Sequence, residues 1–336
     1  MDEQVVNTVQ AELPEATIEV MELPATQPEP AESGTASWLI WGIALVLAIL
    51  AVVVAALLRR QSSNRKKPQP EPLSTNGSET EPVNSLDRLP KLTVVGAQTI
   101  GAREDQEDAF SFSDYQDARQ LTTYGFYAAV SDGIGGLDDG QVASHAAMRV
   151  MQTFFRELPI DMRPSDKLLN LATAAHREVR RLNQEGTRCG ATLVSVLLSG
   201  WDMWLLSIGD SHIYLCRAGT LLLLNRSHTY GNQAEEMSSL AGATTQIDPK
   251  RGRALTSYLG QENLSLIDRT AEPTRLQHGD SLLLMSDGVF GTLSEDEIVA
   301  CLRQDPAGAA NAIVAAVDAK GVRGQDNATV IVINID

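Results

Sequence analysis

Acidic residues stand at the ends of several apolar, strand-like runs, each beside glycine, serine or asparagine. Asp132 follows "YGFYAAV", Asp210 follows "MWLLSIG" and Asp287 follows "SLLLMS". The whole set is Glu107, Asp108, Asp132, Asp210, Asp287 and Asp326. A single Ser-Asp-Gly is usually only a turn. The same arrangement at five places in one chain predicts a shared site.

The chemistry follows from the charge of that set. Several carboxylates cannot share a small space unless a cation neutralises them or some of them take up protons. Hard divalent cations prefer oxygen ligands, so a set of carboxylates with a backbone carbonyl suits Mg²⁺ or Mn²⁺. The residues therefore predict a divalent-cation site.

Other chemistries lack their motifs. No Cys-x₅-Arg loop is present, because the residues six positions after the three cysteines are Ser195, Leu222 and Ala307. There is no Gly-Lys-Ser/Thr of a P-loop, and the five histidines do not have zinc-site spacing. The formal net charge of −16 argues against a nucleic acid as partner.

Residues 91–336 contain the elements that must position these acids. Short apolar and β-branched runs predict strands at 92–99, 108–112, 124–130, 190–198, 203–209, 212–219, 220–224, 281–286 and 328–335. Helices are expected near 139–157, 166–185, 294–303 and 307–319, with Ser294 and Glu297 as a capping box for the third. The connections between 190 and 224 are too short for crossover helices, so those strands should be antiparallel. The pattern predicts an α+β, four-layer α/β/β/α sandwich, whose strand ends can converge on one rim.

The chain before residue 91 has a different character. Residues 38–58 form an apolar run of 21 residues without a charge, long enough for a helix to span the roughly 30 Å hydrocarbon layer. A cleaved signal peptide fits poorly, because the basic residues follow the run instead of preceding it. We expect one transmembrane helix, preceded by a disordered acidic segment at 1–37 and followed by a basic juxtamembrane and Pro-rich flexible linker at 59–90.

Charge on the two sides of residues 38–58 predicts its orientation. Eight acids and no Lys or Arg precede the run, and "RRQSSNRKK" follows it. By the positive-inside rule the N-terminus lies outside the cell membrane and everything after Leu58 lies in the cytoplasm.

Five segments occur in a familiar order: "GAREDQEDAF", "VSDGIGG", "GATLVSVLL…WLLSIGDSHIYLCRAG", "LLLMSDGVFGTLS" and "GQDNATVIV". Together they resemble the metal-dependent protein phosphatases, the PPM or type 2C serine/threonine phosphatases, of bacterial type. The resemblance covers about 94–335. Its motifs are specific jointly, although each is weak alone.

The resemblance implies two Mn²⁺ or Mg²⁺ ions and a looser third. Asp132 would bridge the first two, and Gly133 would give its carbonyl to one of them. The other ligands would be Asp287 and Asp326 on the first ion, Glu107 and Asp108 on the second, partly through water, and Asp210 on the third. A water bridging two cations is acidified and oriented for attack on phosphorus.

Arg103 matches the arginine that clamps the substrate phosphate in this family. A guanidinium suits that role because its fork binds two oxygens at once. The alternative for Arg103 is an internal ion pair with a neighbouring acid.

Some positions depart from the family pattern. Gln106 replaces an asparagine, and Ile134 stands where some relatives have a histidine that acts as general acid. His212 replaces an arginine, Ser227 replaces an aspartate beside His228, and Gly291 replaces a further acid. None of these changes removes a core ligand.

The sequence thus predicts a membrane-anchored phosphatase that hydrolyses phosphoserine and phosphothreonine on cytoplasmic proteins. Its partners would be phosphorylated proteins, including a cognate serine/threonine kinase. The alternative is a catalytically impaired phosphatase-fold adaptor or sensor that binds phosphoproteins. Residues 226–254, polar and rich in glycine, are expected to form either a substrate-recognition flap or a plain surface loop.

Overall fold

The fold is built on two antiparallel sheets. The first has the strand order β1-β11-β10-β6-β7, and the second the order β2-β3-β4-β5-β8, with β9 also pairing with β5. Their bounds are β1 Leu92–Thr99, β2 Ala109–Phe112, β3 Phe126–Ser131, β4 Leu193–Ser199, β5 Asp202–Ile208, β6 His212–Arg217, β7 Thr220–Leu223, β8 Asp268–Arg269, β9 Thr274–Arg275, β10 Ser281–Met285 and β11 Ala328–Ile335. The strands expected at 92–99 and 328–335 have the predicted bounds.

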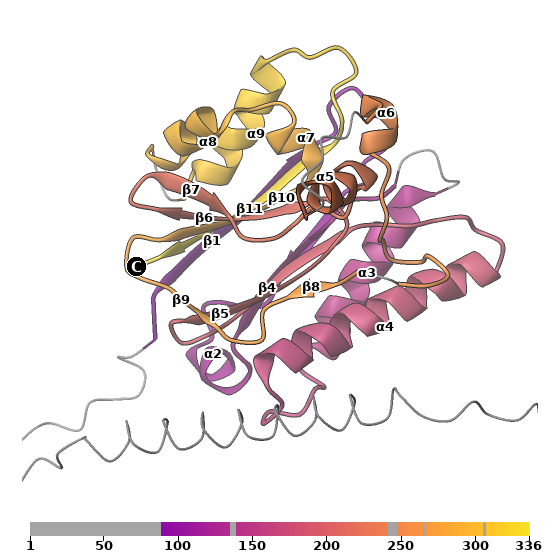
Figure 1. The fold of residues 1–336 in the computed structure, drawn as a ribbon. Helices are drawn as coiled ribbons and strands as arrows, with labels where there is room; N and C mark the ends of the chain where they lie inside the picture. Colours follow the sequence, from indigo (N-terminus) through magenta and orange to yellow (C-terminus); the bar gives the residue numbers. More distant parts are fainter. Residues whose placement is uncertain (1–88, 135–138, 241–246, 265, 305–306) are drawn as a thin grey trace, which may run out of the picture. The chain divides into compact units, whose positions relative to one another are not determined.

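A layer of helices covers the outer face of each sheet, and Figure 1 shows the resulting four layers. The helices are α2 Ala118–Tyr124, α3 Gly140–Phe154, α4 Pro164–Gln184, α5 Tyr230–Leu240, α6 Pro249–Gly252, α7 Asp287–Phe290, α8 Glu295–Leu302 and α9 Ala309–Ala319. Helices α3 and α4 lie on the second sheet, and α8 and α9 lie on the first. The predicted α/β/β/α sandwich is therefore the fold of residues 91–336.

This computed structural model describes residues 89–134, 139–240, 247–264, 266–304 and 307–336. The predicted segments 1–37 and 38–58 and nearly all of the linker 59–90 lie outside the described residues. Within the described ranges, no helix has both the length and the apolar character needed to cross a bilayer.

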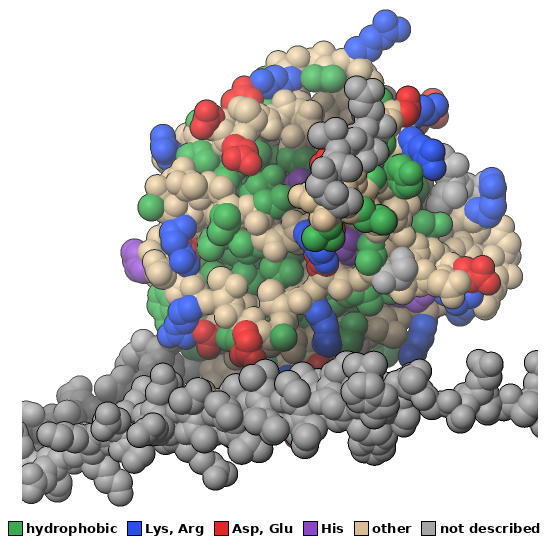
Figure 2. Space-filling view, in the orientation of Figure 1, with side chains coloured by type: hydrophobic (Ala, Val, Ile, Leu, Met, Phe, Trp, Pro, Cys, Tyr) green, Lys and Arg blue, Asp and Glu red, His purple; other side chains and the backbone are tan. Residues whose placement is uncertain are grey.

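Three apolar clusters hold the layers together. One lies between the sheets and includes Val130, Val196 and Ile333, all fully buried. A second packs the other face of the second sheet on α3 and α4, and a third packs the first sheet on α8 and α9. The strands are thus covered on both faces, which explains their nearly continuous apolar sequences. On the surface seen in Figure 2, acidic, basic and apolar side chains are interspersed.

The structure corrects two expectations. Tyr124 ends the short helix α2, so β3 starts only at Phe126. The Asp117 side chain caps the first turn of α2, and Gly125, with φ 82°, ends it. Residues 226–254, for which a flap or a plain surface loop was expected, contain the helices α5 and α6. The capping box of Ser294 and Glu297 at the start of α8 is present.

Candidate active site

Strand registers bring the acidic positions to one rim of the sandwich. In the first sheet, Met285 at the end of β10 lies opposite His212 at the start of β6. In the second sheet, Ala109 at the start of β2 lies opposite Ser131 at the end of β3. At this rim the chain passes from β1 to β2 through residues 100–108 and from β5 to β6 through residues 209–211, each time between the two sheets. Five of the six predicted acids lie on these connections or directly after β3 and β10. The sixth, Asp326, lies just before β11, whose first residue, Ala328, pairs with Thr99 at the end of β1.

Asp132 is held by its backbone at the centre of the rim. Its N–H donates to Thr192 Oγ1 (3.0 Å), and the Thr192 N–H donates to the Asp132 carbonyl (2.8 Å). The Thr192 and Ser211 hydroxyl oxygens are 2.7 Å apart, so one network joins Asp132 to the loop that carries Asp210. Burial, and then the neighbouring Asp108, raise the pKa of Asp132 well above its ordinary value.

Asp108 lies beneath the rim, between the two sheets, and is 1% exposed. Its Oδ2 accepts a hydrogen bond from the Ser286 hydroxyl at 2.7 Å. Among the described residues, its Oδ1 has no hydrogen-bond partner although it is buried. Burial raises the pKa of Asp108 to about 6. Glu107 is partly exposed beside it, and burial raises its pKa against the opposing effect of Arg103.

Asp287 and Asp210 complete the acidic centre from the first sheet and its crossing. Burial raises the pKa of Asp287, with a further contribution from the charge of Asp326. Burial, and then the charge of Asp287, raise the pKa of Asp210 to about 6. Carboxyl groups so close together share protons when no cation is bound.

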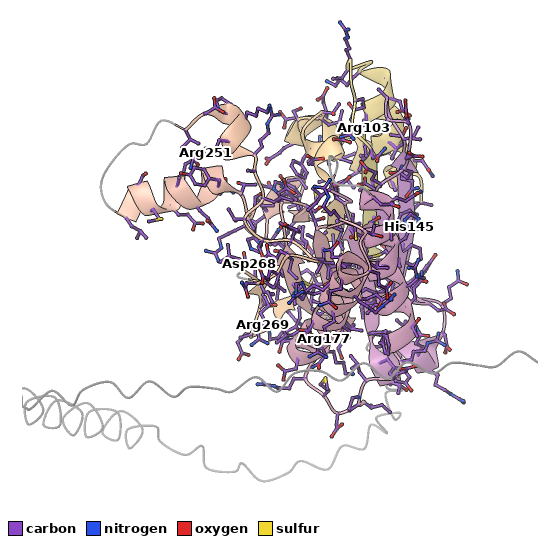
Figure 3. All side chains as sticks on the ribbon, turned by 90° about the vertical axis from the view of Figure 1, so that its right-hand side faces the viewer. Arg103, His145, Arg177, Arg251, Asp268 and Arg269 are labelled. Atoms are coloured by element: carbon purple, nitrogen blue, oxygen red, sulfur yellow. The ribbon has the colours of Figure 1, made fainter. Side chains whose placement is uncertain are left out.

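Arg103 reaches two of the predicted ligands. Its Nη2 lies 2.7 Å from Asp326 Oδ2, and its Nη1 lies 3.3 Å from Glu107 Oε2. The side chain is 41% exposed and faces the pocket at the rim. Figure 3 shows Arg103 at the end of the domain away from Arg269 of β8. Both possibilities predicted for Arg103 are thus compatible with its position: it forms ion pairs with neighbouring acids and still presents an open side to the pocket.

A pocket of about 580 Å³ opens over these side chains. Of the predicted residues it is lined by Arg103, Asp132, Gly133, Asp210, Asp287 and Asp326. Glu107 and Asp108 lie behind that lining. A Cβ on Gly133 would come within 2.5 Å of the Gly140 backbone, so only glycine allows this close approach.

The donor set fits hard divalent cations. Buried carboxyl groups with raised pKa values and an unpartnered buried oxygen on Asp108 are the features that a cation would neutralise. In the part of the chain that the structure describes, no three His, Cys, Asp or Glu side chains are arranged so that they could hold a metal ion as they stand. Arg103 is paired with Glu107 and Asp326, and Asp108 and Asp210 have raised pKa values, so a bound cation would have to exchange with the guanidinium and with protons.

Thermal unfolding should detect this exchange through its pH dependence. Asp108 and Asp210 have an ordinary pKa of 3.8 and a folded-state pKa of about 6. Between these values the folded state holds protons that the unfolded state has released, so the stability of the metal-free protein falls as pH rises through this window. Saturating Mn²⁺ should therefore raise the melting temperature by about 5 °C or more at pH 7.5 and by much less at pH 5. An equal increase at both pH values would contradict a carboxylate site.

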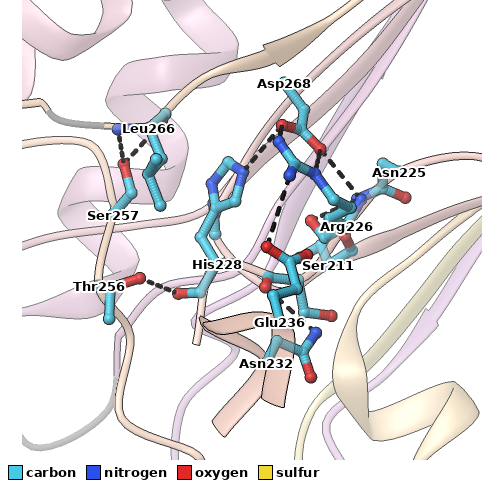
Figure 4. Close-up of polar contacts among 12 residues, drawn as sticks. Ser211, Asn225, Arg226, His228, Asn232, Glu236, Thr256, Ser257, Leu266 and Asp268 are labelled. Atoms are coloured by element: carbon cyan, nitrogen blue, oxygen red, sulfur yellow. Dashed lines mark hydrogen bonds and ion pairs between the residues drawn. The ribbon is translucent and has the colours of Figure 1, made fainter. Parts of the chain in front are cut away.

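The segment after β7 is anchored beside the rim. Figure 4 shows its base, where Arg226 forms a two-pronged ion pair with Asp268 of β8. Buried His228 accepts from the Gly209 N–H through Nδ1 (3.1 Å), and its carbonyl accepts from Thr256. Beyond this base α5 and α6 project from the sandwich in Figure 3, with Arg251 over the ring of Tyr230. A second pocket of about 460 Å³ lies between this flap and the rim.

The departures from the family pattern have structural partners. Gln106 Oε1 accepts from the Asp108 N–H and its Nε2 donates to the Thr99 carbonyl, which braces the turn before β2. His212 and Ser227 contact each other, with 2.8 Å between Nε2 and Oγ, so these two departures form one pair. His212 also stacks on Phe290, and burial lowers its pKa to about 4, which keeps the ring neutral.

Sequence reasoning missed several residues of the site. Thr192 lines the pocket and holds Asp132, while Arg253 and Tyr258 line it from the chain that follows α6. A threonine before a strand has no distinctive spacing. The only signal was its place in "GATLVSVLL", directly before an apolar run.

Comparison with known proteins identifies the family of this chain. Residues 95–311 match the family model described as Protein phosphatase 2C. The mitochondrial protein phosphatase 1K of Xenopus laevis is 29% identical over 266 residues, which cover 72% of this chain and 68% of that protein.

Solved structures show the same architecture. The PPM Ser-Thr phosphatase MsPP of Mycobacterium smegmatis, solved with cacodylate, is 29% identical with a TM-score of 0.58, over 73% of this chain and 98% of that one. The catalytic domain of the serine/threonine phosphatase PstP, solved with two manganese ions, is 24% identical with a TM-score of 0.58, over 73% and 98% of the two chains. Together with the rim of carboxyl groups and the Arg103 pocket, these matches show that the chain is a phosphoprotein phosphatase of the metal-dependent protein phosphatase 2C family.

Proposed function

We propose that the rim binds two Mn²⁺ or Mg²⁺ ions and that Asp210 adds a looser third site. Asp132 would be a ligand of both ions, and Gly133 would give its carbonyl to one of them. Asp287 and Asp326 would serve the first ion, and Glu107 and Asp108 the second. The observation that carries this assignment is a group of partly buried carboxyl groups with raised pKa values around a pocket that also exposes an arginine. When bound, the ions would activate a water and offset charge on the phosphoryl oxygens.

The chain's own residues would supply orientation. Arg103 would leave Glu107 and Asp326 once cations neutralise them, and its fork would then hold two phosphoryl oxygens. Thr192 would keep the Asp132 backbone fixed through its two hydrogen bonds. Ile134 lines the pocket where some relatives have a histidine, so no side chain at that position protonates the leaving serine or threonine alkoxide.

Turnover with defined metals tests the assignment. The full-length chain should release phosphate from phosphoserine and phosphothreonine peptides, and from p-nitrophenyl phosphate, with Mn²⁺ or Mg²⁺. EDTA should abolish this activity, and added Mn²⁺ should restore it. Full activity in EDTA would reject the metal site, and binding of phosphopeptides without any turnover would favour the adaptor that the sequence left open.

We also propose that residues 38–58 anchor the enzyme in the cell membrane, with the N-terminus outside and the catalytic domain in the cytoplasm. Support comes from the uncharged apolar run and from the basic residues that directly follow it. A flexible linker of about 30 residues has a root-mean-square span of roughly 30 Å, so the domain would act on phosphoproteins near the membrane, such as a serine/threonine kinase.

Protease accessibility tests this topology. Protease added to intact cells or spheroplasts should remove the acidic N-terminus and leave residues 91–336 intact, as followed by antibodies to each end. The same protease should digest both ends after the membrane is permeabilised. Cleavage of the catalytic domain in intact cells would reverse the proposed orientation.

A further inference from the structure

Asn327 separates Asp326 from the start of β11, and its side chain is almost completely buried, at 3% exposure. All of its amide contacts are made to the loop between β1 and β2. Oδ1 accepts from the Glu107 N–H at 2.7 Å, and Nδ2 donates to the carbonyls of Ile100 (2.9 Å) and Asp105 (3.0 Å). One side chain thus ties three points of a loop that is more than 200 positions away in the sequence.

These three points frame Arg103 and Glu107. The Ile100 and Asp105 carbonyls lie on either side of Arg103 in the sequence, so the Asn327 amide closes the turn that carries the guanidinium. The bond to the Glu107 N–H fixes the backbone of a proposed cation ligand. A backbone hydrogen bond also ties this turn to the loop before β11: the Ala102 N–H donates to the Gln325 carbonyl at 2.9 Å.

The ion pairs of Arg103 cannot hold its side chain in place during catalysis. Its two partners, Glu107 and Asp326, are themselves proposed cation ligands, and the Arg103 side chain is 41% exposed. With cations bound, these ion pairs are lost and Arg103 must be kept in place by its backbone. The buried contacts of Asn327 remain available in that state, because none of them involves a carboxylate.

We infer that Asn327 is a positioning residue, which holds Arg103 for the phosphate and Glu107 for the cation without touching either ligand. This inference rests on the proposed roles of Arg103 and Glu107. It goes beyond them because it assigns the geometry of both to one neutral side chain, which lies directly before β11.

A double-mutant cycle on the full-length chain tests the link to Arg103. At saturating Mn²⁺, Asn327→Ala should lower kcat/KM for a phosphoserine peptide about 10-fold or more, mainly by raising KM. In an Arg103→Ala background the same substitution should cost less than about twofold, because the group that it positions is already gone. A metal titration followed by melting temperature should also show several-fold weaker Mn²⁺ binding for Asn327→Ala, through Glu107.

Asn334→Ala is the matched control. Asn334 is also a buried asparagine, it lies at the far end of β11, and its Oδ1 accepts from Ser281 Oγ at 2.6 Å. Seven residues of strand place it roughly 23 Å from Asn327. Its loss should destabilise the fold but change kcat/KM by less than about twofold in both the wild-type and the Arg103→Ala background.

The outcomes separate the inference from the proposed function. If Arg103→Ala costs activity and Asn327→Ala costs the same factor with and without Arg103, the positioning role is wrong while the phosphate clamp stands. If Arg103→Ala alone has no effect on activity, both the positioning role of Asn327 and the phosphate clamp of Arg103 are wrong.

If Asn327→Ala is unfolded at the assay temperature, Asn327→Asp replaces it in the cycle. It keeps the volume and the acceptor for Glu107 but not the donor to the two carbonyls, and its cost should likewise fall to less than about twofold in the Arg103→Ala background.

Discussion

Asp132→Asn should abolish turnover and, at the same time, raise the melting temperature of the metal-free protein. Asp132 is the proposed shared ligand, so its neutral amide analogue should lower kcat by roughly 10³-fold or more, equivalent to several kcal/mol of lost charge stabilisation. In the metal-free state the same change removes a buried carboxyl group crowded by other acids. We expect a gain of about 2–5 °C at pH 7.5.

Two measurements on one sample check this opposite behaviour. Phosphate release gives kcat, and melting with and without Mn²⁺ gives the stability of each state. The control is Asp202→Asn, because Asp202 forms a partly exposed ion pair with Arg275 at 2.9 Å on β5 and β9. The control should change neither quantity appreciably. If metal-free Asp132→Asn melted well below wild type, Asp132 would be a structural residue.

Arg103→Ala should lower kcat/KM about 10- to 150-fold, which corresponds to the loss of a charge-assisted contact worth about 1.5–3 kcal/mol. If the guanidinium grips phosphate equally in the ground and transition states, the loss appears mainly in KM. Mn²⁺ affinity should stay the same or increase, because Glu107 and Asp326 lose a competing cation.

The control for Arg103 is another arginine paired with an acid. Arg163 forms an ion pair with Asp166 at 2.7 Å at the start of α4, and its side chain is 81% exposed. Arg163→Ala should leave kcat/KM within about twofold of wild type. Wild-type kcat/KM in Arg103→Ala, or a large loss of Mn²⁺ affinity, would mean that Arg103 is a structural ion-pair residue and that phosphate is held elsewhere.

The sequence was most informative where a predicted site residue stands directly at the end of a clearly predicted strand. Asp132, Asp287 and Asp326 border strands with nearly continuous apolar sequences, and strand ends of a sandwich meet at a rim. Sheet registers place these three acids as that argument predicts. The four layers followed from strand runs that alternate with pairs of helices.

Features that depend on distant partners could not be read in this way. Asn327 and Thr192 act through hydrogen bonds to loops far along the chain, and each looks like an ordinary turn residue locally.

Helix α2 has only seven residues and lacks an apolar period long enough to separate it from the following strand. Helix α5 has no buried residue, so no packing requirement marked it in the sequence.

The division of the acids between the two sheets has a consequence for the lifetime of the molecule. Asp287 and Asp326 come from the first sheet, and Asp132 from the second. Cations bound as proposed would therefore act as a removable crosslink between the two halves of the sandwich, and their binding free energy would add to the cohesion of the sheet interface. Divalent-ion supply would then govern how long each copy of the enzyme survives proteolysis as well as how fast it works.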